Sequence, residues 1–177
     1  MKTFLIGGAR SGKSALATRR AGELAKQVCC LVTATASDDE MAARIAAHRI
    51  ERPATWSVRE EPVHLAAAVR EEDRPGRLLL IDCLTVWTAN CMWPAPVAEP
   101  DIDHWRRERD DFLLSLRECA SDVIIVSNEV GSGIVPESAA ARLFRDEHGW
   151  LNRVIAAACD EVYLVVAGLP LALKTTS

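Results

Sequence analysis

The sequence has no Cys-x-x-Cys pair, although it contains cysteines at positions 29, 30, 83, 91, 119 and 159. Closely spaced cysteine pairs are typical of zinc sites and thiol redox centres, and small disulfide-rich domains depend on a framework of paired cysteines. Several of these cysteines instead lie inside apolar runs, where a reduced cysteine is a small buried hydrophobic residue. The pattern argues against a zinc site or a disulfide framework, and we expect a protein of a reducing, cytoplasmic compartment.

Long apolar runs and an excess of positive charge are also lacking. No run approaches the ~18 residues of a membrane-spanning helix, and the first six residues lead directly into a glycine-rich segment, so we expect no secretory leader. The net charge is -4 at pH 7. A chain without a global basic field does not attract nucleic acid or anionic membranes. We therefore expect no nucleic-acid partner and no stable membrane insertion.

The chain also lacks internal repeats and low-complexity tracts. Its 177 residues are 49% hydrophobic and 26% charged, which is ordinary for a protein with a buried core. This length suits one domain. We expect residues 1–177 to form a single nucleotide-binding domain.

The most informative stretch is residues 7–14, which match G-x-x-x-x-G-K-[ST]. A short apolar run, 3–6, precedes this stretch, and a helix-compatible pattern follows from 15 to 26. In such a loop the backbone N–H groups and a lysine bind phosphates, and glycines allow positive φ, as we expect at Gly7 and Gly12. The hydroxyl at 14 can bind Mg²⁺. The predicted phosphate-binding residues are Gly7, Gly8, Ala9, Arg10, Ser11, Gly12, Lys13 and Ser14.

Apolar runs of strand length alternate with helical patterns along the rest of the chain. Further strands are predicted at 28–33, 78–82, 123–128 and 161–166. Helices are predicted at 40–52, 63–72, 84–92, 102–119, 137–146 and 150–159, with a connector at 56–62 and a proline-rich loop at 93–100. This alternation predicts an α/β fold of the P-loop NTPase type, with a doubly wound, mainly parallel sheet.

The predicted strands end in polar or glycine-bearing segments. Residues 33–37 are small and mostly hydroxyl-bearing, Asp82 ends the third run, and residues 129–136 form a glycine-bearing loop. Ligands gather at the carboxyl edge of an open parallel sheet, so these segments are predicted to lie near the phosphate loop. A carboxylate placed there can orient Mg²⁺ directly or through water, which we expect of Asp82.

A histidine surrounded by arginines stands out in the predicted helix 40–52. Arg44, His48 and Arg52 recur at four-residue spacing and share a face, and Arg49 adjoins the histidine. Positive neighbours disfavour the imidazolium, so His48 is expected to stay neutral and nucleophilic while the arginines bind phosphate. The other histidines carry no such pattern: His64 begins a helix, His104 lies in a polar stretch, and His148 is expected at a helix terminus before Gly149.

These segments together resemble the bifunctional adenosylcobinamide kinase / adenosylcobinamide-phosphate guanylyltransferase family of cobalamin biosynthesis. The likeness covers nearly the whole chain, and the histidine helix together with the Ser-Asn-Glu-Val-Gly block at 127–131 is its most specific part. The matching segments are 7–14, 33–34, 39–41, 44–45, 48, 52–53, 56, 82–85, 90, 127–136, 144–146, 168 and 174.

The resemblance implies two reactions: phosphorylation of the corrinoid adenosylcobinamide with ATP or GTP, then transfer of GMP from GTP to the product through a GMP-histidine on His48. It also implies Mg²⁺ and a homotrimer. By the same resemblance the nucleotide site would be lined by Thr33, Ala34, Thr35, Arg49, Ile50, Glu51, Arg52, Glu60 and Asp82, with Glu60 facing the guanine edge or the ribose.

Three features depart from the family pattern. Position 47 is Ala where some relatives have a second histidine, Asp82 stands where some have Glu, and loop 93–100 differs in composition. An alternative is a P-loop small-molecule kinase without a covalent nucleotidyl step. A regulatory GTP switch is disfavoured because the Asn-Lys-x-Asp base-reading motif is missing, and a nucleic-acid-stimulated ATPase is disfavoured by charge.

Overall fold

Seven strands form one sheet, in the order β3-β2-β4-β5-β1-β6-β7, in a computed structural model that describes residues 1–24, 27–35, 52–94 and 99–175. All neighbouring strands run parallel except β6 and β7. The strands are β1 (Lys2–Gly7), β2 (Gln27–Val32), β3 (Ser57–Glu60), β4 (Arg77–Asp82), β5 (Asp122–Asn128), β6 (Glu161–Val166) and β7 (Leu169–Lys174).

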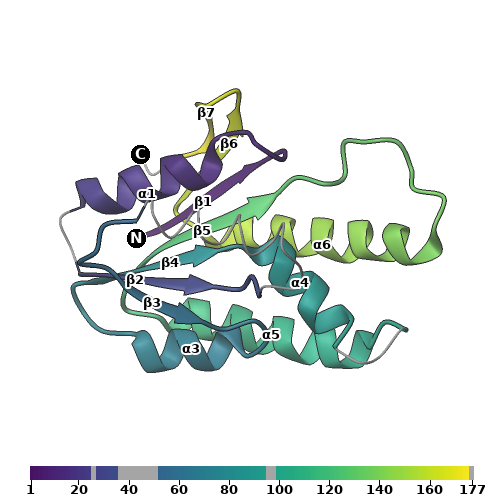
Figure 1. The fold of residues 1–177 in the computed structure, drawn as a ribbon, viewed down its shortest axis with the longest axis horizontal. Coiled ribbons are helices and arrows are strands. Elements are labelled where there is room, and N and C mark those ends of the chain that lie inside the picture. The colour runs from purple at the N-terminus through teal and green to yellow at the C-terminus, as the bar shows by residue number, and fades with distance from the viewer. Residues whose placement is uncertain (25–26, 36–51, 95–98, 176–177) are drawn as a thin grey trace.

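Helices cover both faces of this sheet (Figure 1). Helix α1 packs on one face, and the four other described helices pack on the opposite face. These helices are α1 (Lys13–Glu23), α3 (Leu65–Glu72), α4 (Leu84–Met92), α5 (Ile102–Glu118) and α6 (Ala139–Ala158). The predicted α/β architecture with a mainly parallel, doubly wound sheet is confirmed.

The central strands are apolar throughout because both of their faces are buried. In β1, Phe4 belongs to the core under α3–α6, and the next residue, Leu5, belongs to the core under α1. In β4, Leu79 and Leu80 divide between the two cores in the same way. Alternate side chains point to opposite faces of a strand, so a run without polar interruptions is what a strand between two helical layers requires.

The structure differs from the prediction in three places. The connector 56–62 contains β3, a short edge strand that pairs with β2 and whose mostly exposed, polar residues carry no apolar signal. Strand β7 was not predicted: it is rich in leucine, but Pro170 lies inside it, and all six of its residues are exposed on the edge of the sheet. The two helices expected at 137–146 and 150–159 are one helix, α6. Gly149 does not interrupt α6, whose apolar face, including Leu151 and Ile155, stays continuous against the sheet.

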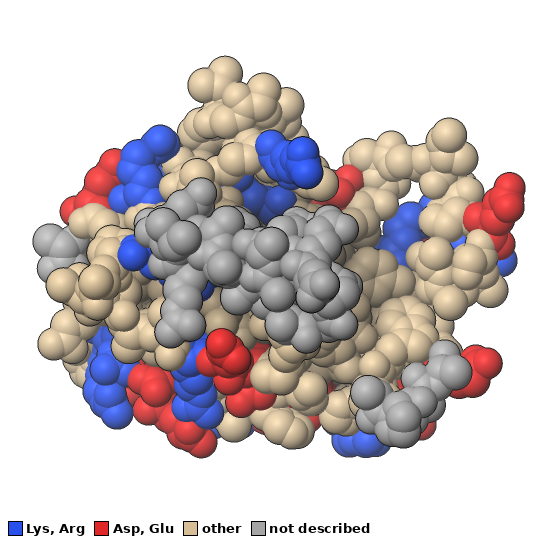
Figure 2. All heavy atoms as spheres, viewed as in Figure 1, with Lys and Arg blue, Asp and Glu red and all other residues tan. Residues whose placement is uncertain are grey.

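Charges of both signs are interleaved on the surface over α3 (Figure 2). Arg59 of β3 lies 2.6 Å from Glu71 and 3.7 Å from Glu72, and Arg70 pairs with Asp111 of α5 at 2.5 Å. Mixed surface pairs of this kind give little stability, and they produce no field of one sign. Among the described residues, no helix is both long and apolar enough to cross a membrane. The predicted helix 40–52 lies almost wholly outside the described residues.

Candidate active site

The predicted phosphate loop connects β1 to α1. Gly7 is the last residue of β1, and α1 begins at Lys13. Gly12 has φ of 92° and Arg10 has φ of 56°, so the chain turns through two left-handed residues before the helix. The expectation of positive φ is confirmed at Gly12 but is wrong at Gly7, which is needed for another reason: a Cβ there would lie 2.4 Å from the carbonyl oxygen of Val165.

Lys13 and Ser11 are the buried polar side chains of this loop. Lys13 is 8% exposed, and its Nζ donates a hydrogen bond to the Gly8 carbonyl at 3.0 Å, so the ammonium lies against the loop. The Ser11 hydroxyl is buried and has no hydrogen-bond partner among the described residues. Its carbonyl accepts from the N–H of Gly168 at 2.8 Å, which ties the loop to the β6–β7 turn. A buried hydroxyl without a partner is rare, and it fits a loop shaped around a polar ligand.

The carboxyl ends of the parallel strands lie at the same edge as this loop. The pairing register places Gly7 of β1 beside Asn128 of β5, and it places Asp82 of β4 beside Val126 and Val32. The N–H of Glu129 donates to the Gly7 carbonyl at 3.0 Å. The predicted phosphate loop, the acidic residue Asp82 and the glycine-bearing loop therefore meet at one edge, as the sequence pattern predicts.

Asp82 forms an ion pair with Arg52 across this edge. The distance from Arg52 Nη2 to Asp82 Oδ2 is 3.2 Å, and the two side chains are 10% and 17% exposed. An ion pair this sheltered from water is screened less than a surface pair. His48, Arg49, Ile50 and Glu51, which complete this segment, lie outside the described residues, so their predicted roles stay predictions.

Thr33 fastens the turn that follows Asp82. Its side chain is fully buried; its hydroxyl donates to the carbonyl of Cys83 at 2.7 Å and accepts from the N–H of Cys83 at 3.0 Å. The amide of Asn90 on α4 donates to the Thr33 carbonyl at 2.9 Å. Thr33 thus contributes to the predicted site indirectly, by fixing the backbone next to Asp82. The following residues, Ala34 and Thr35, are progressively more exposed to solvent.

Glu60 lies two strands away from Asp82. Glu60 is exposed at the carboxyl end of β3, the outermost strand, which is separated from β4 by β2.

Cys83 directly follows Asp82 in the chain. Burial together with the charge of Asp82 raises the pKa of the Cys83 thiol, while the charge of Lys13 acts in the opposite direction. A thiol with a raised pKa carries little thiolate, so Cys83 is not an activated nucleophile.

The glycine-bearing loop after β5 is held by its own acidic residue. The Glu129 carboxylate accepts from the N–H groups of Gly131 at 2.8 Å and Ser132 at 3.0 Å. Partial burial pushes the pKa of this carboxyl upward, but the hydrogen bonds from Ser132 and Gly131 outweigh it and leave the pKa below its ordinary value. Ile134 and Val135 follow, with 96% and 60% of their surface exposed.

His148 is the polar residue that sequence reasoning misjudged. The side chain lies in the middle of α6, not at a helix terminus, and it is fully buried. It contacts hydroxyls from α4 and β5 and the carbonyl of Asn128. Burial lowers the pKa of its imidazole to about 4, against weaker opposing effects of Asn128 and Glu129. Nothing in the local sequence signals this, because the partners come from distant segments.

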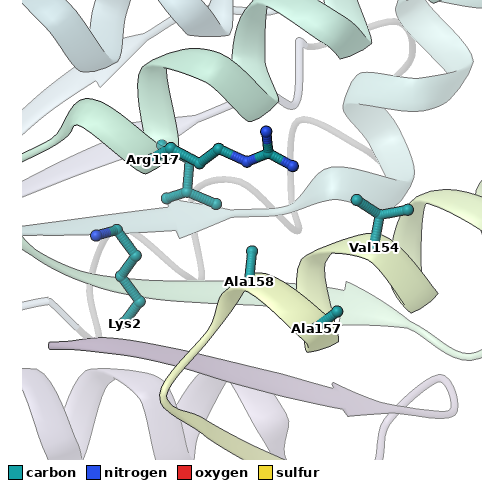
Figure 3. A pocket seen from close by; sticks show the side chains of 6 residues that line it. Lys2, Arg117, Val154, Ala157 and Ala158 are labelled. Carbon is teal, nitrogen blue, oxygen red and sulfur yellow. The ribbon is translucent and has the colours of Figure 1, made fainter.

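A cavity of about 330 Å³ lies away from these residues (Figure 3). Lys2, the first residue of β1, lines it with residues from the last turns of α5 and α6, so it opens at the amino edge of the sheet. Ligands of parallel α/β sheets bind at the opposite edge. We therefore place the candidate site at the phosphate loop.

A profile of the CobU family, described as cobinamide kinase / cobinamide phosphate guanyltransferase, matches residues 3–173. The chain belongs to this family. The bifunctional adenosylcobalamin biosynthesis protein CobP of Pseudomonas aeruginosa is 46% identical over 174 residues, 98% of each chain. The corresponding CobU proteins of Escherichia coli and Salmonella typhimurium are 38% and 40% identical over 183 residues, 98% of this chain and 100% of theirs.

Family membership confirms the resemblance stated from the sequence. It makes the chain a cobinamide kinase and cobinamide phosphate guanylyltransferase of cobalamin biosynthesis. Both activities consume a nucleoside triphosphate, which agrees with the phosphate loop.

Two solved structures share the fold. The RadB recombinase is 14% identical with a TM-score of 0.51, and the match covers 92% of this chain and 73% of that one. The protein PH0250 of Pyrococcus horikoshii is 7% identical with a TM-score of 0.57, covering 99% and 87%. At such low identity these likenesses concern the fold alone.

Proposed function

We propose that the loop 7–14 binds the phosphates of ATP in the kinase reaction and of GTP in both reactions. The support is geometric: the loop stands at the carboxyl edge, its left-handed turn at Arg10 and Gly12 leads into the amino end of α1, and Lys13 lies against it. Backbone N–H groups at a helix amino terminus bind anions without a further charged partner. Thr33–Thr35, Arg52, Glu60 and Asp82 complete the proposed nucleotide site from neighbouring strands.

Ser14 and Asp82 would hold Mg²⁺ in this proposal. A hydroxyl and a carboxylate are the hard oxygen donors that Mg²⁺ prefers, usually with waters and substrate phosphates as the other ligands. The ion pair of Asp82 with the guanidinium of Arg52 supports this proposal, because it places positive charge beside the same carboxylate. When bound, Mg²⁺ neutralises charge on the phosphate oxygens.

His48 is proposed as the nucleophile of guanylyl transfer. An imidazole nitrogen attacks the α-phosphorus of GTP, forming an N–P bond while the bond to the bridging oxygen breaks and pyrophosphate leaves. A phosphate oxygen of adenosylcobinamide phosphate then attacks the same phosphorus, the N–P bond breaks, and the neutral imidazole is restored. A covalent intermediate divides the transfer into two easier steps, and arginines beside the phosphate stabilise the charge in each.

Intact-mass measurement tests this assignment. After incubation of the native protein with GTP and Mg²⁺, we expect a mass increase of one guanylyl group, which is GMP less one water, and the adduct should be lost in acid because an N–P bond is acid-labile. His48→Ala should show no adduct and should retain phosphorylation of adenosylcobinamide. An arginine change, Arg49→Lys, serves as the control: it keeps the nucleophile, so an adduct should form, although more slowly.

The same experiment distinguishes guanylyl transfer through His48 from the alternative, a kinase without a covalent nucleotidyl step. If the native protein phosphorylates adenosylcobinamide but never carries GMP, the covalent step is refuted and a kinase without a nucleotidyl intermediate is left. If His48→Ala still carries the adduct, the nucleophile is a different residue.

The remaining features follow from the family in this proposal: a corrinoid substrate, a homotrimer and a cytoplasmic location. All six cysteines lie within the described residues and are free thiols, which supports a reducing compartment. The trimer is tested by light scattering of the purified protein, where a monomer at working concentration would contradict it.

A further inference from the structure

His148 lies at the point where three elements of the fold meet behind the candidate site. It projects from α6 and is fully buried. Its Nε2 lies 3.0 Å from the hydroxyl of Ser127 on β5 and 3.3 Å from that of Thr85 on α4, and its Nδ1 lies 3.0 Å from the hydroxyl of Thr88. The ring stacks on Phe144, one turn earlier, with centroids 5.5 Å apart and planes 6° apart.

Counting protons shows which nitrogen of His148 carries the hydrogen. The Asn128 carbonyl, 3.2 Å from Nε2, can only accept a hydrogen bond. The Ser127 hydroxyl donates to Oδ1 of Asn152 at 2.7 Å, so its oxygen is also an acceptor toward Nε2. Both contacts require Nε2–H. In the neutral ring Nδ1 is then an acceptor. The Thr88 hydroxyl lies 3.0 Å from Nδ1 and 2.8 Å from the carbonyl of Leu84, so its one hydrogen is shared between these two acceptors.

This network holds the backbone of Asn128, the last residue of β5. Its carbonyl accepts from Nε2–H of His148 and from Nδ2 of Asn152 at 3.0 Å, and its N–H donates to the Thr85 hydroxyl at 2.8 Å. Side chains from two helices therefore satisfy both backbone polar groups of this residue. A residue whose backbone is held on both sides has little freedom to move.

Asn128 adjoins the candidate site in two directions. Asn128 pairs in register with Gly7, and the next N–H, that of Glu129, donates to the Gly7 carbonyl at 3.0 Å. On the other side, Thr85 lies in the first turn of α4, and this helix begins directly after Asp82 and Cys83. The His148 network thus connects the entry to the phosphate loop with the helix that follows the acidic residue.

We propose that His148 is a positioning residue of the nucleotide site, which holds the end of β5 in the geometry that the phosphate loop requires. The inference rests on the proposed binding of the triphosphate by loop 7–14. Its role is to keep one Nε2–H donor aimed at the Asn128 carbonyl, so a side chain with a donor at the same reach replaces it, and an apolar ring of similar size does not.

Titration of the full-length protein with GTP and Mg²⁺ tests this role. His148→Phe keeps the ring volume and loses the donor, and we expect GTP affinity to fall about tenfold, the effect of losing one hydrogen bond of ordinary strength. His148→Gln keeps a donor at nearly the same distance and should restore affinity to within about threefold of the native value. The control is Leu151→Val or Leu151→Ala, whichever matches the unfolding midpoint of His148→Phe, and it should bind GTP normally.

The outcomes separate positioning from mere stability. Equal GTP affinity in His148→Phe and the matched Leu151 variant would overturn the proposal, as would a Gln variant as defective as the Phe variant. If His148→Phe does not fold, Thr85→Val removes the α4 side of the same network and should weaken GTP binding in the same way; normal binding by it would overturn the proposal. Failure of the native protein to bind GTP would instead refute the proposed function.

Discussion

Gly7 and Gly8 are adjacent but are required to different degrees. A Cβ on Gly7 would lie 2.4 Å from the Val165 carbonyl and 2.8 Å from Oγ of Ser11, whereas a Cβ on Gly8 would meet nothing within 4 Å. Gly7 is the last residue of a strand that pairs with β5 and β6, so it cannot move aside without breaking the sheet. The packing of the strand end, and not loop flexibility, makes glycine necessary at this position.

Gly7→Ala is therefore expected to displace the phosphate loop. We expect about 1–3 kcal/mol of lost stability from overpacking and at least about a tenfold loss of GTP affinity, because small displacements of a binding group are costly. Gly8→Ala is the matched control for stability and should leave the free energy of unfolding nearly unchanged, because a Cβ there meets no protein atom within 4 Å. Urea unfolding and GTP titration of the two variants check this, and indistinguishable variants would contradict it.

At the scale of elements, α5 is held by an aromatic cluster on the face opposite α1. The Trp87 ring of α4 meets Trp105 at 5.2 Å and Phe112 at 5.0 Å, both edge to face. All three are fully buried. This geometry is favourable beyond the buried area alone. The cluster fastens α5 to α4 without contacting the phosphate loop, so it contributes to stability and not directly to the candidate site.

Phe112→Ala should accordingly reduce stability alone. Truncating a buried Phe costs about 3–5 kcal/mol, and GTP affinity measured well below the unfolding midpoint should stay within about twofold of the native value. Leu114→Ala, on the same helix but 48% exposed, should change stability by no more than about 0.5 kcal/mol. Chemical denaturation together with titration measures both effects, and a large loss of affinity in Phe112→Ala would show that α5 does contribute to the site.

The elements also show why sequence prediction succeeded in some places and failed in others. The central strands β1, β2, β4 and β5 were found because strands buried on both faces are continuous apolar runs. The edge strand β3 lacked that signal because it is short and mostly polar. Strand β7 is rich in leucine, but Pro170 lies inside it, and a proline within a run argues against a strand except at the edge of a sheet. Gly149 was interpreted as a helix end because glycine is a weak helix former, but the packing of α6 on the sheet outweighs that preference.

At the scale of the whole molecule, two groups make stability depend on pH in the acid range. Burial lowers the pKa of His148 to about 4, so between about 4 and the ordinary 6.5 only the unfolded chain binds this proton. For Asp73, burial raises the pKa, but hydrogen bonds from Ser121 and Ala120 have the larger combined effect and lower the pKa to about 2. Below the ordinary 3.8 the unfolded chain again binds more protons. Stability must therefore rise with pH through both windows.

The free energy of unfolding is thus expected to fall as the pH is lowered from 7 to 4, with a contribution from His148 of at most about 1.4 kcal/mol per pH unit. His148→Gln cannot titrate and should flatten this part of the profile. Asp73→Asn should flatten only the part below about pH 4, because the carboxylate that accepts from Ser121 is gone. Urea unfolding at a series of pH values measures the slopes, and an unchanged slope in His148→Gln would show that the imidazole is not neutral in the folded protein.

The fold class, the phosphate loop and the family follow from the amino-acid sequence alone. These depend on patterns that are local in the chain: the spacing of glycines, Lys13 and Ser14, apolar runs of strand length, and the acidic residue that ends β4. Each pattern retains its physical meaning wherever the segment lies, so no knowledge of distant contacts is needed to interpret it.

The residues that support this loop can be identified only from contacts in the folded protein. Gly7 must be glycine because the carbonyl of Val165, far along the chain, lies close to it. Asp82 forms an ion pair with Arg52, which is also distant in sequence. His148 became significant because α4, β5 and α6 converge on its ring. Burial, close approach and the proton count of a network are properties of residues brought together from distant segments, and no local pattern encodes them.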